Sequence, residues 1–195
     1  MVAKLFLGIA VSLVSVSCDA QVVASAARPT LSTSVGGGMN YWSGDWGAGN
    51  INRWGPSAWA TVTVWHNFGI IAEGHSMFIG GNANAPNFKY FAGGGGLIYT
   101  LKRWRRFQPS LKAGAGYASL SHPPNGSNHL HDTGNIWTLG GGFEYHTYAN
   151  LWASVGYSYD FFPNFQSDVN GQKNGLNPRG FTFGMTYRFG PSRQM

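Results

Sequence analysis

Residues 181–189 read FTFGMTYRF, and they decide the fold because apolar and polar side chains alternate along them. One face carries Phe181, Phe183, Met185, Tyr187 and Phe189, and the other carries Thr182, Gly184, Thr186 and Arg188. A period of two indicates a β-strand with one apolar and one polar face. Residues 151–161 alternate in the same way, so two such strands are expected at the end of the chain.

The same alternation recurs upstream and predicts eight strands in total. They lie near residues 31–41, 58–64, 70–75, 91–102, 107–118, 137–146, 151–161 and 181–189. Short breaks fall near residues 66–67, 104–105 and 148–149. Longer breaks, rich in the turn formers Gly, Asn, Pro, Asp and Ser, fall at 43–56, 80–87, 119–133 and 163–177. Short turns that alternate with long loops indicate an antiparallel up-and-down meander in one domain.

The composition excludes several other classes of protein. Of the 195 residues only 10% are charged, against about 25% in an ordinary soluble domain. Glycine is abundant, with 29 residues, and aromatic residues make up 15% of the chain. Gly and aromatic residues are poor helix formers, which argues against an α-helical enzyme. The aromatic content argues against disorder, and beyond the first 20 residues no apolar run is long enough for a membrane-spanning helix.

Residues 30–190 allow about 20 residues for each strand with its connection, enough for strands of about 10 residues that cross a bilayer. The edges of an open sheet would leave backbone groups unbonded in lipid, so the sheet is expected to close into a barrel. The expected strand charges share the face opposite the aromatic residues: Glu73, Lys102, Lys112, Glu144, Asp160 and Arg188. This pattern predicts a transmembrane barrel, apolar outside and polar inside. The alternative is a soluble lipocalin-like barrel or sandwich whose aromatic residues form the core.

The N-terminus resembles a secretory signal peptide over residues 1–20, which leaves residues 21–195 as the barrel domain. Lys4 supplies a positive charge before an uncharged, largely apolar stretch at 5–17. Cleavage is expected after Ala20, with Ala26 as the second option. Cys18 has no partner for an intramolecular disulfide, and its lipidation is an alternative.

The chain resembles the eight-stranded outer-membrane barrels of the OmpA-like class. The resemblance rests on the aromatic alternation at 181–189, which is similar to a C-terminal signal read by the barrel-assembly machinery, and on the stretch at 107–114. Six residues follow Phe189, whereas members of this class often end on the aromatic residue. The resemblance implies an outer-membrane location, contact with outer-membrane lipids including lipopolysaccharide, and both termini in the periplasm.

Four charges are expected to form an interior network: Glu73, Lys112, Glu144 and Arg188. Charges inside a narrow barrel must pair, because an isolated buried charge costs several kcal/mol. One interpretation is a static network that plugs the interior. The other resembles the inner gate of OmpA-like barrels, in which a change of partners lets ions pass.

Other candidate sites have weaker patterns. His122, His129, His131 and Asp132 share a loop but match no compact zinc motif, so no metal site is expected. Ser119, Ser121 and His122 are candidates for a lipid A-modifying enzyme, although no G-x-S-x-G motif is present. The glycines at 93–96 lack the helix and lysine of a phosphate loop and suit a tightly curved sheet. The basic stretch Lys102, Arg103, Arg105 and Arg106 flanks Trp104 and suits anionic lipid headgroups better than nucleic acid.

The sequence therefore predicts a monomeric outer-membrane barrel without cofactor, metal or catalytic residues. Its expected role is structural, or the presentation of its four long loops to an unknown extracellular partner. A narrow gated pore for ions or small solutes is the second hypothesis, and a lipid A-modifying enzyme is the third.

Overall fold

A computed structural model describes residues 32–46, 49–65, 67–79, 89–122, 130–163 and 177–189. The expected signal peptide, its cleavage sites, Cys18 and His129 lie outside these residues. Among the described residues, no helix has the length and apolar character needed to cross a bilayer.

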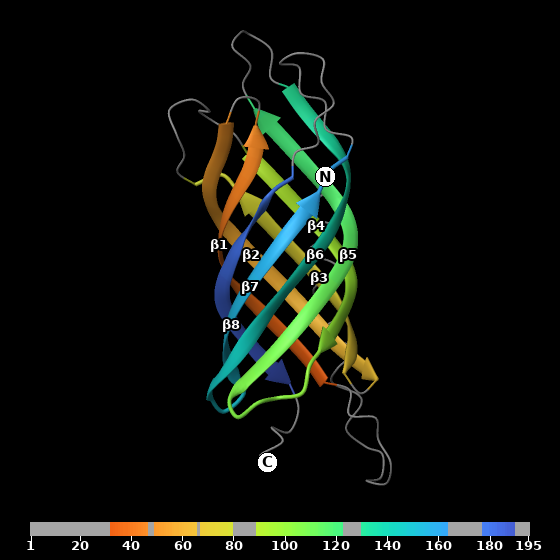
Figure 1. The fold of residues 1–195 in the computed structure, drawn as a ribbon, viewed down its shortest axis with the longest axis vertical. Coiled ribbons are helices and arrows are strands. Elements are labelled where there is room, and N and C mark those ends of the chain that lie inside the picture. The colour runs from red at the N-terminus through yellow and green to blue at the C-terminus, as the bar shows by residue number, and fades with distance from the viewer. Residues whose placement is uncertain are drawn as a thin grey trace.

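Eight antiparallel strands form a closed barrel (Figure 1). The strands are β1 (Ser32–Trp46), β2 (Gly49–Trp65), β3 (Phe68–Met77), β4 (Lys89–Thr100), β5 (Phe107–His122), β6 (Leu130–Tyr148), β7 (Leu151–Phe161) and β8 (Arg179–Phe189). Each strand pairs with its neighbours in the sequence, and β1 pairs with β8 from Thr33–Phe189 to Ser43–Arg179. The expected all-β, eight-stranded up-and-down barrel is confirmed.

The two ends of the barrel differ in their connections. The turns β2–β3, β4–β5 and β6–β7 lie at the end where β1 begins and β8 finishes, which is the lower end in Figure 1. We call this the turn end and the opposite one the loop end. The predicted breaks at 80–87 and 163–177 fall between β3 and β4 and between β7 and β8, whose facing ends lie at the loop end, but residues 80–87 and 164–176 lie outside the described residues.

The prediction of long loops at 43–56 and 119–133 is wrong for most of both segments. β1 continues to Trp46, which pairs with Gly49, so residues 49–56 belong to β2. β5 continues to His122, which pairs with Leu130. Gly, Asn and Asp favour turns in isolation, but here their backbone groups bond to neighbouring strands, and pairing overrides the local preference.

The apolar face of the barrel points outward. Phe181, Phe183, Met185, Tyr187 and Phe189 of β8 are all 42–49% exposed. Thr186, on the other face of the same strand, is fully buried inside the barrel. The surface of the strands is therefore apolar and the interior carries the polar groups, as in a transmembrane barrel. Lys102 is an exception to the expectation, because β4 ends at Thr100 and Lys102 is exposed in the β4–β5 turn.

Glycines on the inner face allow adjacent strands to approach closely where the sheet is strongly curved. Gly96 of β4 lies opposite Gly114 of β5, and Gly94 lies opposite Gly116. A Cβ atom added at Gly96 would run into the backbone carbonyl of Ala113. Strong curvature of a narrow barrel thus depends on the missing side chains at these positions.

We expect Gly96→Ala to lower the free energy of unfolding by about 1–3 kcal/mol, because the new methyl group must displace backbone. Urea unfolding of the barrel in phospholipid vesicles measures this change. Gly37→Ala is the control, since its Cβ would meet only Ser57 O at 3.5 Å. Equal stability of Gly96→Ala and the control would show that the close approach of β4 and β5 is not required.

Candidate functional site

The turn-end half of the interior contains a polar cavity of about 260 Å³. It reaches from Ser32 and Asn67 at the turn end to Trp42 and His75 in the middle of the barrel. Hydroxyl side chains from several strands line it, among them Ser34, Thr61, Thr63, Ser110, Ser154 and Thr182. They face inward because they occupy the polar positions of the alternating pattern.

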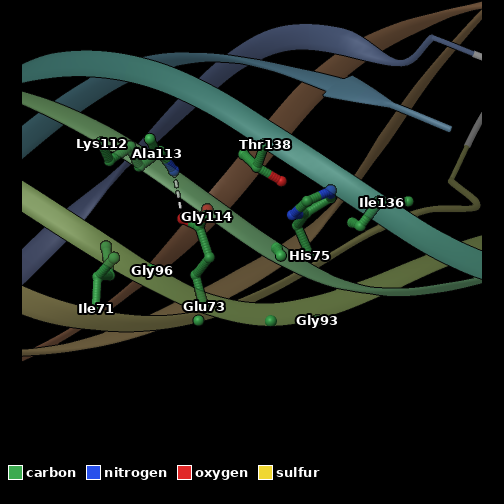
Figure 2. Close-up of a pocket in the computed structure, with 13 residues that line it drawn as sticks. Ile71, Glu73, His75, Gly93, Gly96, Lys112, Ala113, Gly114, Ile136 and Thr138 are labelled. Atoms are coloured by element: carbon green, nitrogen blue, oxygen red, sulfur yellow. Dashed lines mark hydrogen bonds and ion pairs between the residues drawn. The ribbon is translucent and has the colours of Figure 1, made fainter.

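Two ion pairs cross this cavity. Lys112 Nζ of β5 donates to Glu73 Oε2 of β3, and Arg188 Nη2 of β8 donates to Glu144 Oε2 of β6. Each pair bridges two strands that are not neighbours in the sheet. In Figure 2 Glu73 and Lys112 reach toward one another beside Gly96 and Gly114. A Cβ atom added at Gly140 of β6 would lie 2.7 Å from Lys112 Cε, so this glycine leaves room for the lysine side chain.

The four charges predicted as an interior network thus line the same cavity but form two separate pairs. Their side chains are 18–25% exposed, so the pairs retain partial contact with solvent. The Arg188 guanidinium also lies 3.9 Å from the ring centroid of Trp152. These contacts fix the positions of all four side chains.

Three polar oxygen atoms in this cavity meet no partner among the described residues. They are Ser57 Oγ, Gln108 Oε1 and Ser154 Oγ. Buried polar groups in proteins are normally satisfied by protein or by ordered water. A polar cavity of this size has room for several water molecules, so the turn-end half is suited to be a hydrated chamber.

The loop-end half is filled mainly by apolar side chains, with the buried polar residues Asn40, Arg53 and Ser76 among them. Its buried cluster comprises Trp42, Ile51, Met77, Tyr90, Ala92, Ala118, Leu120, Ile136 and Phe162. Trp42, Met77, Tyr90, Leu120 and Phe162 are at most 1% exposed. We call this cluster the loop-end plug, because it occupies the lumen between the cavity and the loops.

A buried carboxylate lies at the boundary between the plug and the cavity. Asp160 of β7 is 0% exposed and contacts three polar groups. Tyr90 Oη donates to its Oδ2 at 3.0 Å, Thr138 Oγ1 donates to its Oδ1 at 2.7 Å, and His75 Nε2 lies 2.8 Å from Oδ2. The His75 ring stacks on Trp42 at 4.3 Å between centroids. This cluster therefore ties β3, β4, β6 and β7 to the plug.

The sequence-based candidate set omitted Asp160 and His75. Both residues stand on the polar face of their strands, which was a usable signal. Their pairing was not visible, because it joins positions 85 residues apart. Only closure of the sheet brings β3 and β7 to opposite walls of one lumen.

The remaining candidates do not assemble into a catalytic or metal site within the described residues. No three His, Cys, Asp or Glu side chains gather there in a metal-binding arrangement. Ser119 and Ser121 lie near the loop end of β5, while the side chains of His122 and His131 lie outside what the structure describes. The basic stretch around Trp104 forms the exposed β4–β5 turn.

Comparisons with known proteins agree with this architecture. A family model described as "Outer membrane protein beta-barrel domain" matches residues 9–189. The solved structure of Neisserial surface protein A superposes with a TM-score of 0.64 at 19% identity, covering 80% of this chain and 97% of that chain. Ail of Yersinia pestis gives a TM-score of 0.57 at 16% identity, covering 82% and 99%. OprG of Pseudomonas aeruginosa gives 0.52 at 14% identity, covering 83% and 97%. No curated protein matches the sequence closely enough to be called a relative.

We expect Asp160→Ala to lower the free energy of unfolding by about 3–5 kcal/mol, because it leaves three buried polar groups without their acceptor. Glu144→Ala is the matched control and should cost about 1 kcal/mol or less, since its partner Arg188 keeps solvent and Trp152 as neighbours. Urea titrations in vesicles compare the two variants. Equal losses would contradict the assignment of Asp160 as the buried anchor of the plug.

Proposed function

The chain belongs to the outer membrane protein β-barrel domain family, and on this premise we propose that it is a sealed barrel with a structural or surface-interaction role. The observation that carries the proposal is the loop-end plug, which fills the lumen with side chains that are almost fully buried. A sealed lumen leaves the barrel wall as an anchor and the loop end as the surface available to an extracellular partner.

The same proposal gives the barrel an orientation. The short turns face the periplasm and the longer connections face outward, which is the usual arrangement of outer-membrane barrels. The exposed aromatic residues contact lipid, and lipopolysaccharide surrounds the outer half of the barrel. In this arrangement the hydrated cavity opens toward the periplasm and ends blindly at Trp42 and His75.

A narrow gated pore is the second candidate, because the cavity and its two ion pairs already occupy half of the lumen. Ions would still have to pass the plug, whose apolar side chains offer them no hydration. We therefore infer that the ion pairs are static and that they neutralise one another inside the barrel. The enzyme hypothesis receives no support from the described residues.

Planar-bilayer recordings test the sealed lumen. We expect no stable conductance steps from the unmodified barrel. Trp42→Ala/Phe162→Ala should open a path by removing two large plug side chains, and Trp137→Ala/Phe143→Ala is its control, because both of those residues face outward. Steady channels in the unmodified barrel that change in Glu144→Ala or Arg188→Ala would instead establish the gated pore.

Lipid A mass after expression in a Gram-negative host tests the remaining alternative. We expect the lipid A mass to be the same with and without the protein. A mass change that is lost in His122→Ala would establish an enzyme and contradict the proposed role.

A further inference from the structure

The β4–β5 turn concentrates positive charge at the turn end. Lys102, Arg103, Arg105 and Arg106 are all exposed and occupy four of five consecutive positions. Among the carboxylates of the described strands, Glu144 stands the fewest residues from a strand end at the turn end. It pairs with Arg188 inside the barrel. The turn therefore presents cations that no neighbouring carboxylate of the described chain neutralises.

The backbone of this turn holds an arginine where glycine is the usual residue. Trp104 N donates to Phe107 O at 2.8 Å and Phe107 N donates to Trp104 O at 2.9 Å, which leaves Arg105 and Arg106 at the tip. Arg105 has a φ of 55°, in the left-handed region that favours glycine. A strained backbone conformation at a non-glycine residue is a reason to look for a role of its side chain.

Internal contacts fix part of the turn and leave the rest exposed. Arg103 Nε donates to Arg105 O at 2.7 Å, and its guanidinium lies 5.0 Å from the ring centroid of Trp152. Arg103 thus holds the turn against the barrel through these two contacts. Arg106 Nη1 donates to Tyr145 Oη at 3.4 Å, a contact that remains exposed. The charged groups of Lys102, Arg105 and Arg106 thus remain on the surface of the turn.

Aromatic side chains place these cations at the level of a membrane interface. Each short turn carries one highly exposed aromatic residue: Trp65 at 61%, Trp104 at 70% and Tyr148 at 80%. Trp and Tyr are enriched where a barrel passes from hydrocarbon to headgroups. The cations at the tip of the β4–β5 turn lie at the same height along the barrel axis as these three aromatic residues.

An apolar wall begins directly beside the turn. Phe107 and Leu111 of β5 face outward at 40% and 58% exposure, and Phe143 of β6 does so at 46%. The Phe107 and Phe143 rings contact edge to face with centroids 6.3 Å apart. Positive charge at headgroup level lies next to an apolar outer surface. This arrangement is complementary to a ligand with an anionic head and acyl chains.

We propose that Lys102, Arg105 and Arg106, with Trp104, bind the phosphate of an anionic glycerophospholipid in the periplasmic leaflet. The proposal rests on the proposed function, because it requires the turn end to face that leaflet. The cations hold the phosphate, Trp104 lies against the glycerol region, and the acyl chains lie along Phe107, Leu111 and Phe143. The left-handed backbone at Arg105 positions one of the three charges.

Native mass spectrometry of the full barrel in mixed micelles containing phosphatidylglycerol and phosphatidylcholine tests this site. We expect retained phosphatidylglycerol to exceed retained phosphatidylcholine, and Arg105→Gln/Arg106→Gln to reduce that preference about tenfold or more. Lys89→Gln/Arg179→Gln is the matched control, because it removes two exposed cations near the loop end and should preserve the preference. Equal retention of both lipids by the unmodified barrel, or an unchanged preference in the Arg105/Arg106 variant, would overturn the proposal.

Two substitutions to glycine distinguish the effect of charge from the effect of backbone strain. Ala149, in the β6–β7 turn, also has a left-handed φ, of 47°. Arg105→Gly and Ala149→Gly both relieve strain and should fold at least as well as the parent. Only Arg105→Gly should lower the phosphatidylglycerol preference, and an equal reduction in both would assign the effect to turn geometry and overturn the proposal.

Two further controls distinguish failure of the lipid-site proposal from failure of the proposed function. If millimolar glycerol phosphate displaces the retained lipid, the turn is a site for soluble anions and the lipid proposal is overturned. A heat-dependent shift in gel mobility after addition to vesicles reports insertion. An inserted barrel without lipid preference contradicts this inference alone, whereas failure to insert contradicts the proposed function as well.

Discussion

The structure depends on one constraint: backbone N–H and C=O groups facing lipid must find their partners within the sheet. The pairing of β1 with β8 meets this constraint, because it removes both edges of an eight-stranded sheet. Closure then divides every strand into a lipid-facing and a lumen-facing side. The outward aromatic residues, the inward charges and the glycines at close strand contacts all follow from that division.

The polar side chains in the lumen are satisfied in two different ways. Near the turns it keeps a cavity in which Glu73–Lys112 and Glu144–Arg188 pair while still in contact with solvent. Near the loops buried side chains exclude solvent, and the carboxylate of Asp160 at that boundary is surrounded by hydrogen-bonding groups. The change along the axis from a polar cavity to mainly apolar packing is the physical basis for regarding the barrel as sealed.

Sequence reasoning predicted what depends on alternation and missed what depends on pairing. The period of two in residues 181–189 correctly assigned Phe183 outward and Thr186 inward, and the same rule found all eight strands. It failed at residues 43–56, because local turn preferences say nothing of the partners that extend β1 and β2. It also placed Glu73 and Lys112 on the inner face without fixing their partners, since partner choice requires the register of three strands. The contact between His75 and Asp160 was hidden for the same reason.

The most direct test of the account is a nitroxide scan along residues 181–189 of the barrel in phospholipid vesicles. Each position would carry a single labelled cysteine in a chain with Cys18→Ser, and collisions with oxygen, which dissolves in lipid, would be measured. The account predicts high oxygen accessibility at positions 181, 183, 185, 187 and 189 and low accessibility at the positions between them. The opposite phase, or exposure of the odd positions to a water-soluble relaxant instead, would show that the aromatic face does not contact lipid and would contradict the account.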